Sequence, residues 1–442
     1  MKEKLFNIAW FSPVKEGCTS WYLTKKLLPY LKDYFSIELF TDTLSSGVQE
    51  TLAVKVNHYL SFFQKEKHFH TALYFLDTTP FSSFVRYHLG LSPGVVIFES
   101  LWSDAKSPDP LIESPWKDFI KKLYNFNHLI PKKPPYFWDD KNLLLEREIS
   151  LACLPIFISA RDTEEFQREV KLSVQGKSPK AFYLPCPVDF FCKEDDPFAL
   201  STLTIASAAL PTLEGRAHKW VKALARAAKK GVKAKLFWAV EEELLSAALE
   251  QLKDAGFNLA KNKAVLEKIE VKLISSLSPR LWQSIVKDAH IAIHTYSGVV
   301  GKLYPYLTIS LAAGSYVVVS RFSESFWLPD EAVYKVKLGA GEEEEFFKLF
   351  LFFADNAQNL KRNKTALDYA KLFHSSEEKA FELKEILLSN FELLMDIKKR
   401  WLRVRELAFN ELVASFSSSF DALEKSLLEK INLREILEEI TA

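Results

Sequence analysis

Short apolar runs alternate with amphipathic segments of helical length through most of the chain. This alternation predicts strands separated by helices, and therefore βα units that build a parallel sheet. The expected strands of the first half are residues 5–11, 37–40, 72–76, 95–98, 154–159 and 181–184. The first of these strands leads through a Ser-Pro and Glu-Gly turn into an expected helix at residues 21–34.

The pattern breaks at residues 185–197, where three prolines and several acidic residues follow an expected strand. Such a stretch is typical of a domain boundary. A second alternating series follows. Its expected strands are residues 203–207, 234–239, 271–274, 289–294 and 316–320, and its expected helices are residues 219–230, 241–255, 279–287 and 304–313. Two series of similar size predict two Rossmann-like domains that face one another.

Beyond Gly341 the spacing of apolar residues is helical. Four glutamates at positions 342–345 stand where a helix begins, and the helix dipole favours acidic side chains there. We therefore expect a first Rossmann-like domain at residues 1–187, a second at 188–375 and a helical C-terminal extension at 376–442. The extension is expected either to cross back to the first domain or to mediate oligomerisation.

Composition narrows the function classes. The chain has 442 residues, and its 58 Lys and Arg nearly balance its 57 Asp and Glu. This balance disfavours a dedicated nucleic-acid partner. The four cysteines form no CxxC pair, and His68 and His70 lack a third ligand nearby, so no disulfide framework and no metal site are expected. Without a signal-like segment or an uncharged apolar stretch of about 18 residues, we expect a cytoplasmic protein.

Several segments, taken in order, carry a resemblance to a known family. They are Ile8-Ala-Trp-Phe-Ser-Pro13 with Glu16-Gly17, Leu27-Leu-Pro-Tyr-Leu31, Pro93-Gly-Val-Val-Ile-Phe98, Ile156-Phe-Ile-Ser159, Tyr183-Leu-Pro-Cys-Pro-Val-Asp189, Asp288-Ala-His-Ile-Ala-Ile-His294, Ser310-Leu-Ala-Ala-Gly314 and Tyr316-Val-Val-Val-Ser320. In this order they resemble the GT-B glycosyltransferases, in particular the retaining, nucleotide-sugar-dependent enzymes of family 4 (group 1). The resemblance implies an α/β fold with two facing Rossmann-like domains and a helical C-terminal extension.

The same resemblance implies the activity. The chain would transfer a sugar, as a hexosyltransferase of glycan biosynthesis, from a nucleotide-sugar donor to a glycan, lipid-linked or protein acceptor. The donor would lie in the second domain and the acceptor in the first. The nucleotide sugar is a co-substrate, and no metal or other cofactor is expected.

Donor-binding candidates cluster at expected strand-to-helix loops. A diphosphate needs backbone amides, a helix N-terminus and cationic side chains. The loop with Ser297, Gly298, Gly301 and Lys302 leads into a helix, so its amides are candidates to cradle phosphate and Lys302 to neutralise charge. The alternative for this loop is an ordinary turn.

Further donor-binding candidates stand at other strand ends. Arg216 and Lys219 open the first helix of the second domain, and the alternative for them is a solvated helix end. His294 ends a strand, and Gly17 follows the first strand of the chain, where ligands of α/β sheets bind.

The catalytic positions depart from the family pattern. Retaining members commonly carry two glutamates eight positions apart, and Gly301 and Ile309 stand at these positions here. Where relatives carry a histidine after the strand at 95–98, this chain has Glu99. A carboxylate there is a candidate base for an acceptor hydroxyl, which suits inverting chemistry. Asp104 is the second candidate base.

Two other functions stay open. The missing glutamates and the long helical extension also fit a catalytically inactive GT-B-like binding or scaffold subunit of a glycosylation complex. A sugar or nucleotide epimerase of the same architecture is a third reading, because architecture alone does not fix function. The C-terminal helices are candidates for contact with a membrane surface, a second copy of the chain or a different chain.

Overall fold

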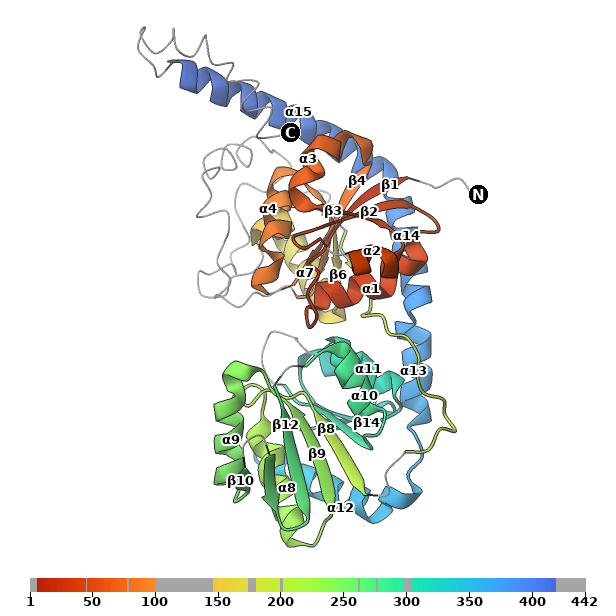
Figure 1. Cartoon of the computed structure of the whole chain (residues 1–442), viewed down its shortest axis with the longest axis vertical. Helices are drawn as coiled ribbons and strands as arrows, with labels where there is room; N and C mark the ends of the chain where they lie inside the picture. Colours follow the sequence, from red (N-terminus) through yellow and green to blue (C-terminus); the bar gives the residue numbers. More distant parts are fainter. Residues whose placement is uncertain are drawn as a thin grey trace. The chain divides into compact units, whose positions relative to one another are not determined.

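The computed structural model describes residues 6–44, 46–77, 79–100, 146–173, 180–198, 202–260, 263–275, 277–296 and 304–418. The chain divides into two compact units. Unit 1 comprises Met1–Ile158, Asp162–Leu184 and Ala380–Ala442, and unit 2 comprises Ser159–Arg161 and Pro185–Lys379. Each unit is built on one sheet with helices packed against it (Figure 1).

The sheet of unit 1 has seven strands in the order β3-β2-β1-β4-β5-β6-β7, and every pairing in it is parallel. The strands are β1 (Asn7–Phe11), β2 (Ser36–Thr41), β3 (Lys55–His58), β4 (Thr71–Leu76), β5 (Gly94–Phe98), β6 (Ala152–Phe157) and β7 (Phe182–Tyr183). The strand order reverses between β1 and β4. Ligands of open parallel sheets bind outside the carboxyl ends of the strands at such a reversal.

The helices of unit 1 cover a sheet whose central strands are apolar on both faces. They are α1 (Thr19–Leu31), α2 (Ser46–Leu52), α3 (Phe62–Lys65), α4 (Ser83–Leu91), α6 (Glu146–Leu151), α7 (Ala160–Ser173), α14 (Ser376–Ser389) and α15 (Phe391–Ser418). Ala9, Phe11 and Phe98 belong to the core on one face, and Trp401 of α15 joins the same core. Burial on both faces explains why these strands are continuous apolar runs in the sequence.

The sheet of unit 2 has eight strands in the order β10-β11-β12-β9-β8-β13-β14-β15. The strands are β8 (Leu203–Ser207), β9 (Ala234–Ala239), β10 (Asn258–Ala260), β11 (Lys263–Leu266), β12 (Ile269–Ile274), β13 (Ile291–His294), β14 (Tyr316–Ser320) and β15 (Val333–Val336). The pairs β10–β11 and β11–β12 are antiparallel, and the other pairs are parallel. The order reverses between β8 and β13, which places the switch point of this unit there.

The helices of unit 2 are α8 (Ala217–Lys229), α9 (Leu245–Asp254), α10 (Pro279–Val286), α11 (Tyr304–Ala312), α12 (Glu342–Asn356) and α13 (Lys364–His374). The small alanine side chains of α8 allow close packing against α12. Helix α10 begins at Pro279 because Ser278 caps it: the Ser278 hydroxyl accepts a hydrogen bond from the Leu281 amide, and proline is well suited to the first turn of a helix.

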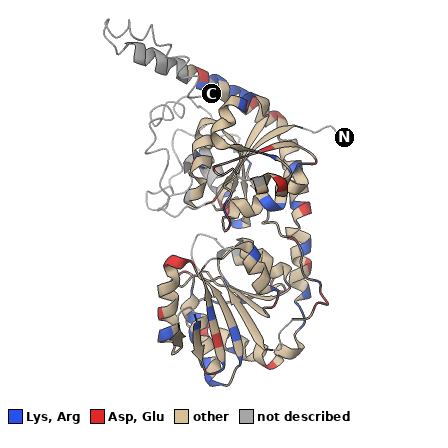
Figure 2. Ribbon diagram, in the orientation of Figure 1, with Lys and Arg blue, Asp and Glu red and all other residues tan. Residues whose placement is uncertain are grey.

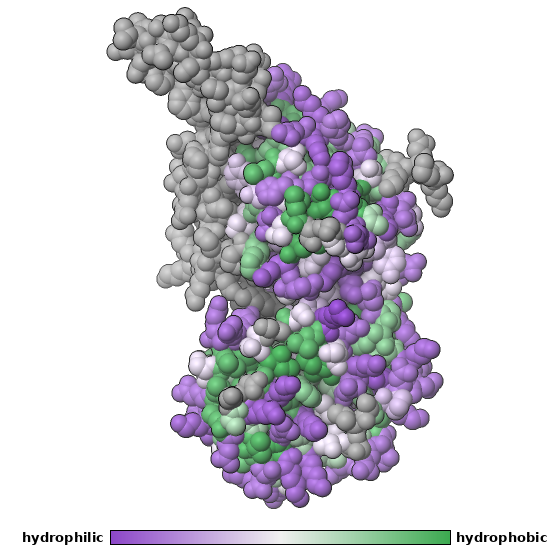
Figure 3. All heavy atoms as spheres, viewed as in Figure 1, coloured by the Kyte–Doolittle hydropathy of each residue, from purple (hydrophilic) through white to green (hydrophobic). Residues whose placement is uncertain are grey.

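Hydrophilic side chains are interspersed with apolar patches on the face of the molecule that Figure 3 shows.

The predicted fold class is confirmed: the chain is α/β, with two sheets dominated by parallel pairs and a helical C-terminal region. Helices and strands differ from the expected ranges at their ends. The hairpin of β10 and β11 was not predicted, because every residue of β10 is exposed and gives no apolar pattern. The helix expected at 241–255 begins only at Leu245, after a 3-10 turn at Glu242–Leu244.

The C-terminal extension returns to unit 1, the first of the two alternatives given for it. Lys398 donates to the carbonyl oxygen of Glu66 over 3.0 Å, and the Trp401 indole donates to that of Leu91 over 2.9 Å. None of the helices within the described residues is both long and apolar enough to cross a membrane.

Candidate functional site

In unit 2, the switch point is formed by the loops that follow β8 and β13. Gly215 lies so close to the preceding turn that a Cβ atom there would fall 2.1 Å from the carbonyl oxygen of Leu210. The carbonyl of Gly215 accepts a hydrogen bond from the Thr295 hydroxyl over 2.7 Å. This bond ties the start of α8 to the end of β13. A glycine at 215 is therefore required for the tight turn of the loop after β8, in which residue 215 packs against Leu210.

Arg216 stands at the start of α8 in the left-handed region, with φ of 55°. Its Nε lies 2.8 and 2.9 Å from the two carboxylate oxygens of Glu342, and its Nη2 also binds Glu342. These hydrogen bonds raise the pKa of Arg216 above its ordinary value. Glu342 is buried. The structure thus gives Arg216, a predicted donor-binding residue, a carboxylate partner from the acidic start of α12.

Lys219, also predicted to bind the donor, lies in the first turn of α8 and is half-buried. Within the described part of the chain it forms no ion pair. Burial lowers the pKa of the neighbouring His218, and the charges of Lys219 and Arg216 lower it further. The helix start is therefore a cationic environment, which is the kind of place where an anion binds.

His294 ends β13 and is buried against α10 and α11. Its Nε2 lies 2.9 Å from the Ser310 hydroxyl, which also accepts a hydrogen bond from the Trp282 indole over 3.1 Å. Burial lowers the pKa of His294 to about 3, so the imidazole is neutral at physiological pH. Its Nδ1 is buried and has no hydrogen-bond partner among the described residues. The structure shows His294 within the helix packing, although the sequence predicted contact with the donor.

Four donor-binding predictions and one catalytic prediction fall outside the described residues. They are Ser297, Gly298, Gly301, Lys302 and Asp104. Gly17, by contrast, lies in an exposed turn between β1 and α1 with φ of 92°. Only glycine adopts that conformation without strain, and the turn delivers the chain to the start of α1.

In unit 1, Glu99 follows β5 directly and is 9% exposed. Its amide donates to the carbonyl of Leu76 over 2.9 Å, which extends the pairing of β4 with β5 by one residue. Its Oε1 accepts a hydrogen bond from the Thr19 hydroxyl over 2.5 Å. Glu99 is thus a carboxylate at the carboxyl end of the sheet, with an oxygen already held by α1.

Asp77 follows β4 and is a second carboxylate at the same edge. Its Oδ2 accepts from the Ser20 hydroxyl over 2.5 Å, and its Oδ1 accepts from the hydroxyls of Thr79 over 2.5 Å and Ser82 over 2.7 Å. Arg86 donates to the carbonyl oxygen of Asp77 over 2.8 Å. The sequence analysis did not identify Asp77, Thr19 or Ser20. An Asp directly after a strand and a Thr-Ser pair at a helix start were the available signals.

The Cys18 thiol lies at the start of α1 beside these groups. Burial raises the pKa of Cys18 to about 12, and the charges of Asp77 and Glu99 contribute to the rise. A protonated thiol is a poor nucleophile and a poor metal ligand. Across the ranges that the structure describes, no group of three or more His, Cys, Asp or Glu is arranged to hold a metal ion.

Comparison with known proteins supports the fold. No family model matches the sequence, and no curated protein matches it significantly. Among solved structures, HepE of Anabaena in complex with UDP-glucose is similar with a TM-score of 0.55 at 12% identity, over 87% of this chain and 100% of HepE. The fold is GT-B.

Two further GT-B structures agree. Sucrose-phosphate synthase of Thermosynechococcus elongatus has a TM-score of 0.53 at 12% identity, over 88% of this chain and 99% of that one. A glycosyltransferase of Rickettsia africae ESF-5 has a TM-score of 0.52 at 12% identity, over 88% and 98%. At this identity the likeness concerns the GT-B fold, so an activity has to be argued from the residues of this chain.

Proposed function

We propose that this GT-B protein is a glycosyltransferase that takes a sugar from a nucleotide-sugar donor. The observation that carries the proposal is the buried Glu99 carboxylate at the carboxyl edge of the unit 1 sheet, where it is held by Thr19. The donor is assigned to the carboxyl edge of unit 2 and the acceptor to that of unit 1. The fold likeness to HepE in complex with UDP-glucose supports a nucleotide sugar as the donor.

The chemistry assigns Glu99 the role of base. Its carboxylate takes the proton of an acceptor hydroxyl while the hydroxyl oxygen bonds to the anomeric carbon of the donor. The bond from that carbon to the diphosphate breaks, and the nucleoside diphosphate leaves with the electron pair. Direct displacement by one acceptor inverts the configuration at the anomeric carbon. Asp104 stays a second candidate base from the sequence.

Negative charge that grows on the diphosphate has to be offset where the donor binds. The start of α8 offers backbone amides and Lys219, and the sequence adds the loop 297–302 with Lys302. The charge of Arg216 is already paired with Glu342, so we assign Arg216 the role of holding the start of α8 in place and not that of binding the diphosphate directly. We propose that these groups suffice without a metal ion.

Release of nucleotide from a panel of nucleotide sugars tests the proposal. Turnover with at least one donor is expected. Because no metal ion is proposed to take part, the turnover should persist when a metal chelator is added. Glu99→Gln should lower kcat by about 10²-fold or more, in the range of general-base catalysis. Glu16→Gln is the matched control, because Glu16 is an exposed carboxylate near the same edge, paired with Lys25. Lys219→Ala should weaken donor use as well as slow the reaction.

A specific observation favours the alternative function, a catalytically inactive subunit of a glycosylation complex. At one position of the family glutamate pair the chain has Ile309, whose side chain is buried in α11. Binding of a nucleotide diphosphate raises the unfolding temperature of either kind of protein. Stabilisation by a nucleotide diphosphate without release from any donor would therefore favour the inactive subunit.

The acceptor is proposed to be a glycan, a lipid-linked sugar or a protein. Contacts through α15 bear on the lipid-linked case. Its exposed basic residues Lys399, Arg400 and Arg403 form one stretch, with the exposed acidic residues Glu392 and Asp396 before it and Glu406 after it (Figure 2). Such a mixed face is typical of a solvated helix and supplies no net positive charge to attract an anionic membrane.

A further inference from the structure

Two carboxylates stand at neighbouring strand ends of unit 1. Leu76 of β4 pairs with Phe98 of β5, and Asp77 and Glu99 are the next residues of these strands. Successive residues of a strand point to opposite faces. Leu76 and Phe98 belong to one core of the unit, so Asp77 and Glu99 share the other face of the sheet.

The first turn of α1 holds both carboxylates by consecutive hydroxyls. Thr19 donates to Glu99 over 2.5 Å, and Ser20 donates to Asp77 over 2.5 Å. Both hydroxyl residues are buried. The helix start also presents its positive dipole end to these carboxylates, which is a favourable electrostatic interaction. We refer to Thr19, Ser20, Asp77 and Glu99 as the carboxylate clamp.

The two carboxylates differ in what surrounds them. Both oxygens of Asp77 accept hydrogen bonds within the chain, from Ser20 on one side and from Thr79 and Ser82 on the other. The Thr79 amide adds a further donor at 3.0 Å. A carboxylate that accepts this many hydrogen bonds fixes the elements that donate to it. Asp77 therefore joins α1 to the loop that follows β4.

We propose that Thr19 is the positioning residue of Glu99, and that Asp77, through Ser20, fixes the helical turn that carries Thr19. The inference rests on the proposed function, in which Glu99 is the base. A hydroxyl that donates to a carboxylate favours its charged form. Thr19 therefore orients the base and keeps it deprotonated at lower pH than it would otherwise be.

Charged and titratable groups of four other residues lie close to Glu99. Within the described residues these are the Cys18 thiol on α1, Lys15 in the loop after β1, Asp77 after β4 and Arg86 on α4. A substitution confined to Thr19 leaves all four in place, so a change in the titration of Glu99 reports the hydroxyl.

The decisive variant is Thr19→Val, which keeps the branched shape and removes the hydroxyl. The acid limb of kcat/KM for nucleotide release should move to higher pH by about one unit, and kcat should fall by about 10-fold while the donor KM stays within about 2-fold. Thr19→Ser should restore the acid limb. Ser20→Ala should shift it in the same direction by less, because Thr19 keeps its own bond.

Thr24→Val is the matched control. Thr24 lies on the same helix, is fully buried, donates to the carbonyl of Ser20 over 2.9 Å and accepts from the Trp10 indole over 3.1 Å. Its replacement should lower the unfolding temperature without moving the acid limb. An equal shift in Thr24→Val would show that any loss of packing in α1 moves the limb, and would overturn the inference.

A second measurement does not require turnover. The carboxyl carbon of Glu99, labelled with ¹³C and assigned by its absence in Glu99→Gln, should titrate at higher pH in Thr19→Val than in the unchanged protein. Identical titration in the two proteins would overturn the inference that Thr19 acts on Glu99, and it would leave the proposed role of Glu99 as base unaffected. Full activity of Glu99→Gln would instead overturn the proposed base, while the titration still decides whether Thr19 holds Glu99.

Discussion

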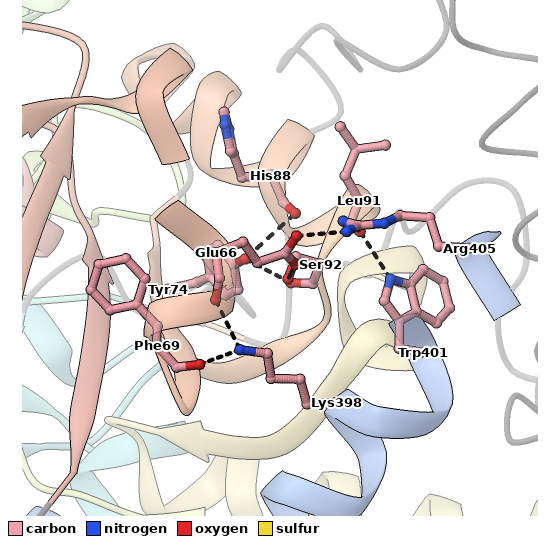
Figure 4. Close-up of polar contacts among 9 residues, drawn as sticks. All are labelled: Glu66, Phe69, Tyr74, His88, Leu91, Ser92, Lys398, Trp401 and Arg405. Carbon is pink, nitrogen blue, oxygen red and sulfur yellow. Dashed lines mark hydrogen bonds and ion pairs between the residues drawn. The ribbon is translucent and has the colours of Figure 1, made fainter. Parts of the chain in front are cut away.

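Arg405 of α15 binds Glu66 through Nη2 and Oε2 at 2.6 Å, a contact between residues 339 positions apart in the chain. The other oxygen of Glu66 accepts from the Ser92 hydroxyl over 2.7 Å. Lys398 and Trp401 of the same helix donate to backbone carbonyls of the segments around Glu66 and Leu91 (Figure 4). Glu66 is 3% exposed, so these partners take the place of the water that would otherwise solvate its carboxylate.

Arg405→Ala should therefore destabilise unit 1. Removing one partner of a buried pair costs about 3–5 kcal/mol, and because the Arg405 side chain is 25% exposed, a loss of about 2–3 kcal/mol is expected after screening. Urea unfolding followed by circular dichroism measures it. Arg403→Ala, an exposed position on the same helix, should stay within about 0.5 kcal/mol of the unchanged protein. Equal effects of the two substitutions would contradict the importance of the Glu66 contact.

The pairing of Arg216 with Glu342 predicts that Arg216 contributes to stability and Lys219 to donor binding, so that substitutions at the two positions have different effects. Arg216→Ala leaves the buried Glu342 carboxylate without its partner and should cost about 2–4 kcal/mol of unfolding free energy. Lys219 lies three residues after Arg216, in the first turn of α8. Lys219→Ala should change the unfolding free energy by less than about 0.5 kcal/mol and should lower the affinity for a nucleoside diphosphate. Calorimetry of binding and urea unfolding on both variants give the comparison. A stable Arg216→Ala that has lost nucleotide affinity would place Arg216 directly on the donor.

Of the four histidines that are buried among the described residues, three predict a loss of stability in mild acid. Burial lowers the pKa of His88 and His374 to about 4 and that of His294 to about 3. The unfolded chain binds these protons near pH 6.5 and the folded chain does not, so stability falls as pH drops below 6.5. Each imidazole contributes on the order of 1–2 kcal/mol at pH 5.

Urea midpoints at pH 7.5 and pH 5 test this expectation. His374→Asn should lower stability at pH 7.5 but reduce the difference between the two pH values. His68→Gln, at an exposed position, should leave that difference unchanged. A midpoint in the unchanged protein that is the same at both pH values would contradict burial of neutral histidines.

The sequence predicted the fold class because buried parallel strands are continuous apolar runs, as in Ile291–His294 and Tyr316–Ser320. It predicted the start of α12 from its four glutamates. It did not predict β15, whose exposed Tyr334 and partly exposed Lys335 interrupt the apolar pattern. Edge strands face solvent on one side, and their sequences are correspondingly mixed.

The site was predictable only where a residue stands directly after a strand. Glu99 was found in this way, and Gly17 was found because it lies in the loop that joins β1 to α1. The partner of Arg216 lies 126 positions away, and no local pattern links it to Glu342. Thr19 and Ser20 escaped notice because a hydroxyl pair in the first turn of a helix is common, and its meaning depends on which carboxylates the sheet brings to it.

The return of the chain to unit 1 has a consequence for biosynthesis. Residues 185–379 are contiguous, so the second unit is complete once they have emerged from the ribosome. The first unit is not, although its strands are made earlier, because Trp401 and Arg405 are translated after the whole of the second unit. Until then the carbonyl of Leu91 and the charge of Glu66 lack their final partners. The earliest part of the chain to be synthesised is therefore the last to mature, and a nonsense mutation near position 390 would harm strands and helices made more than 200 residues earlier.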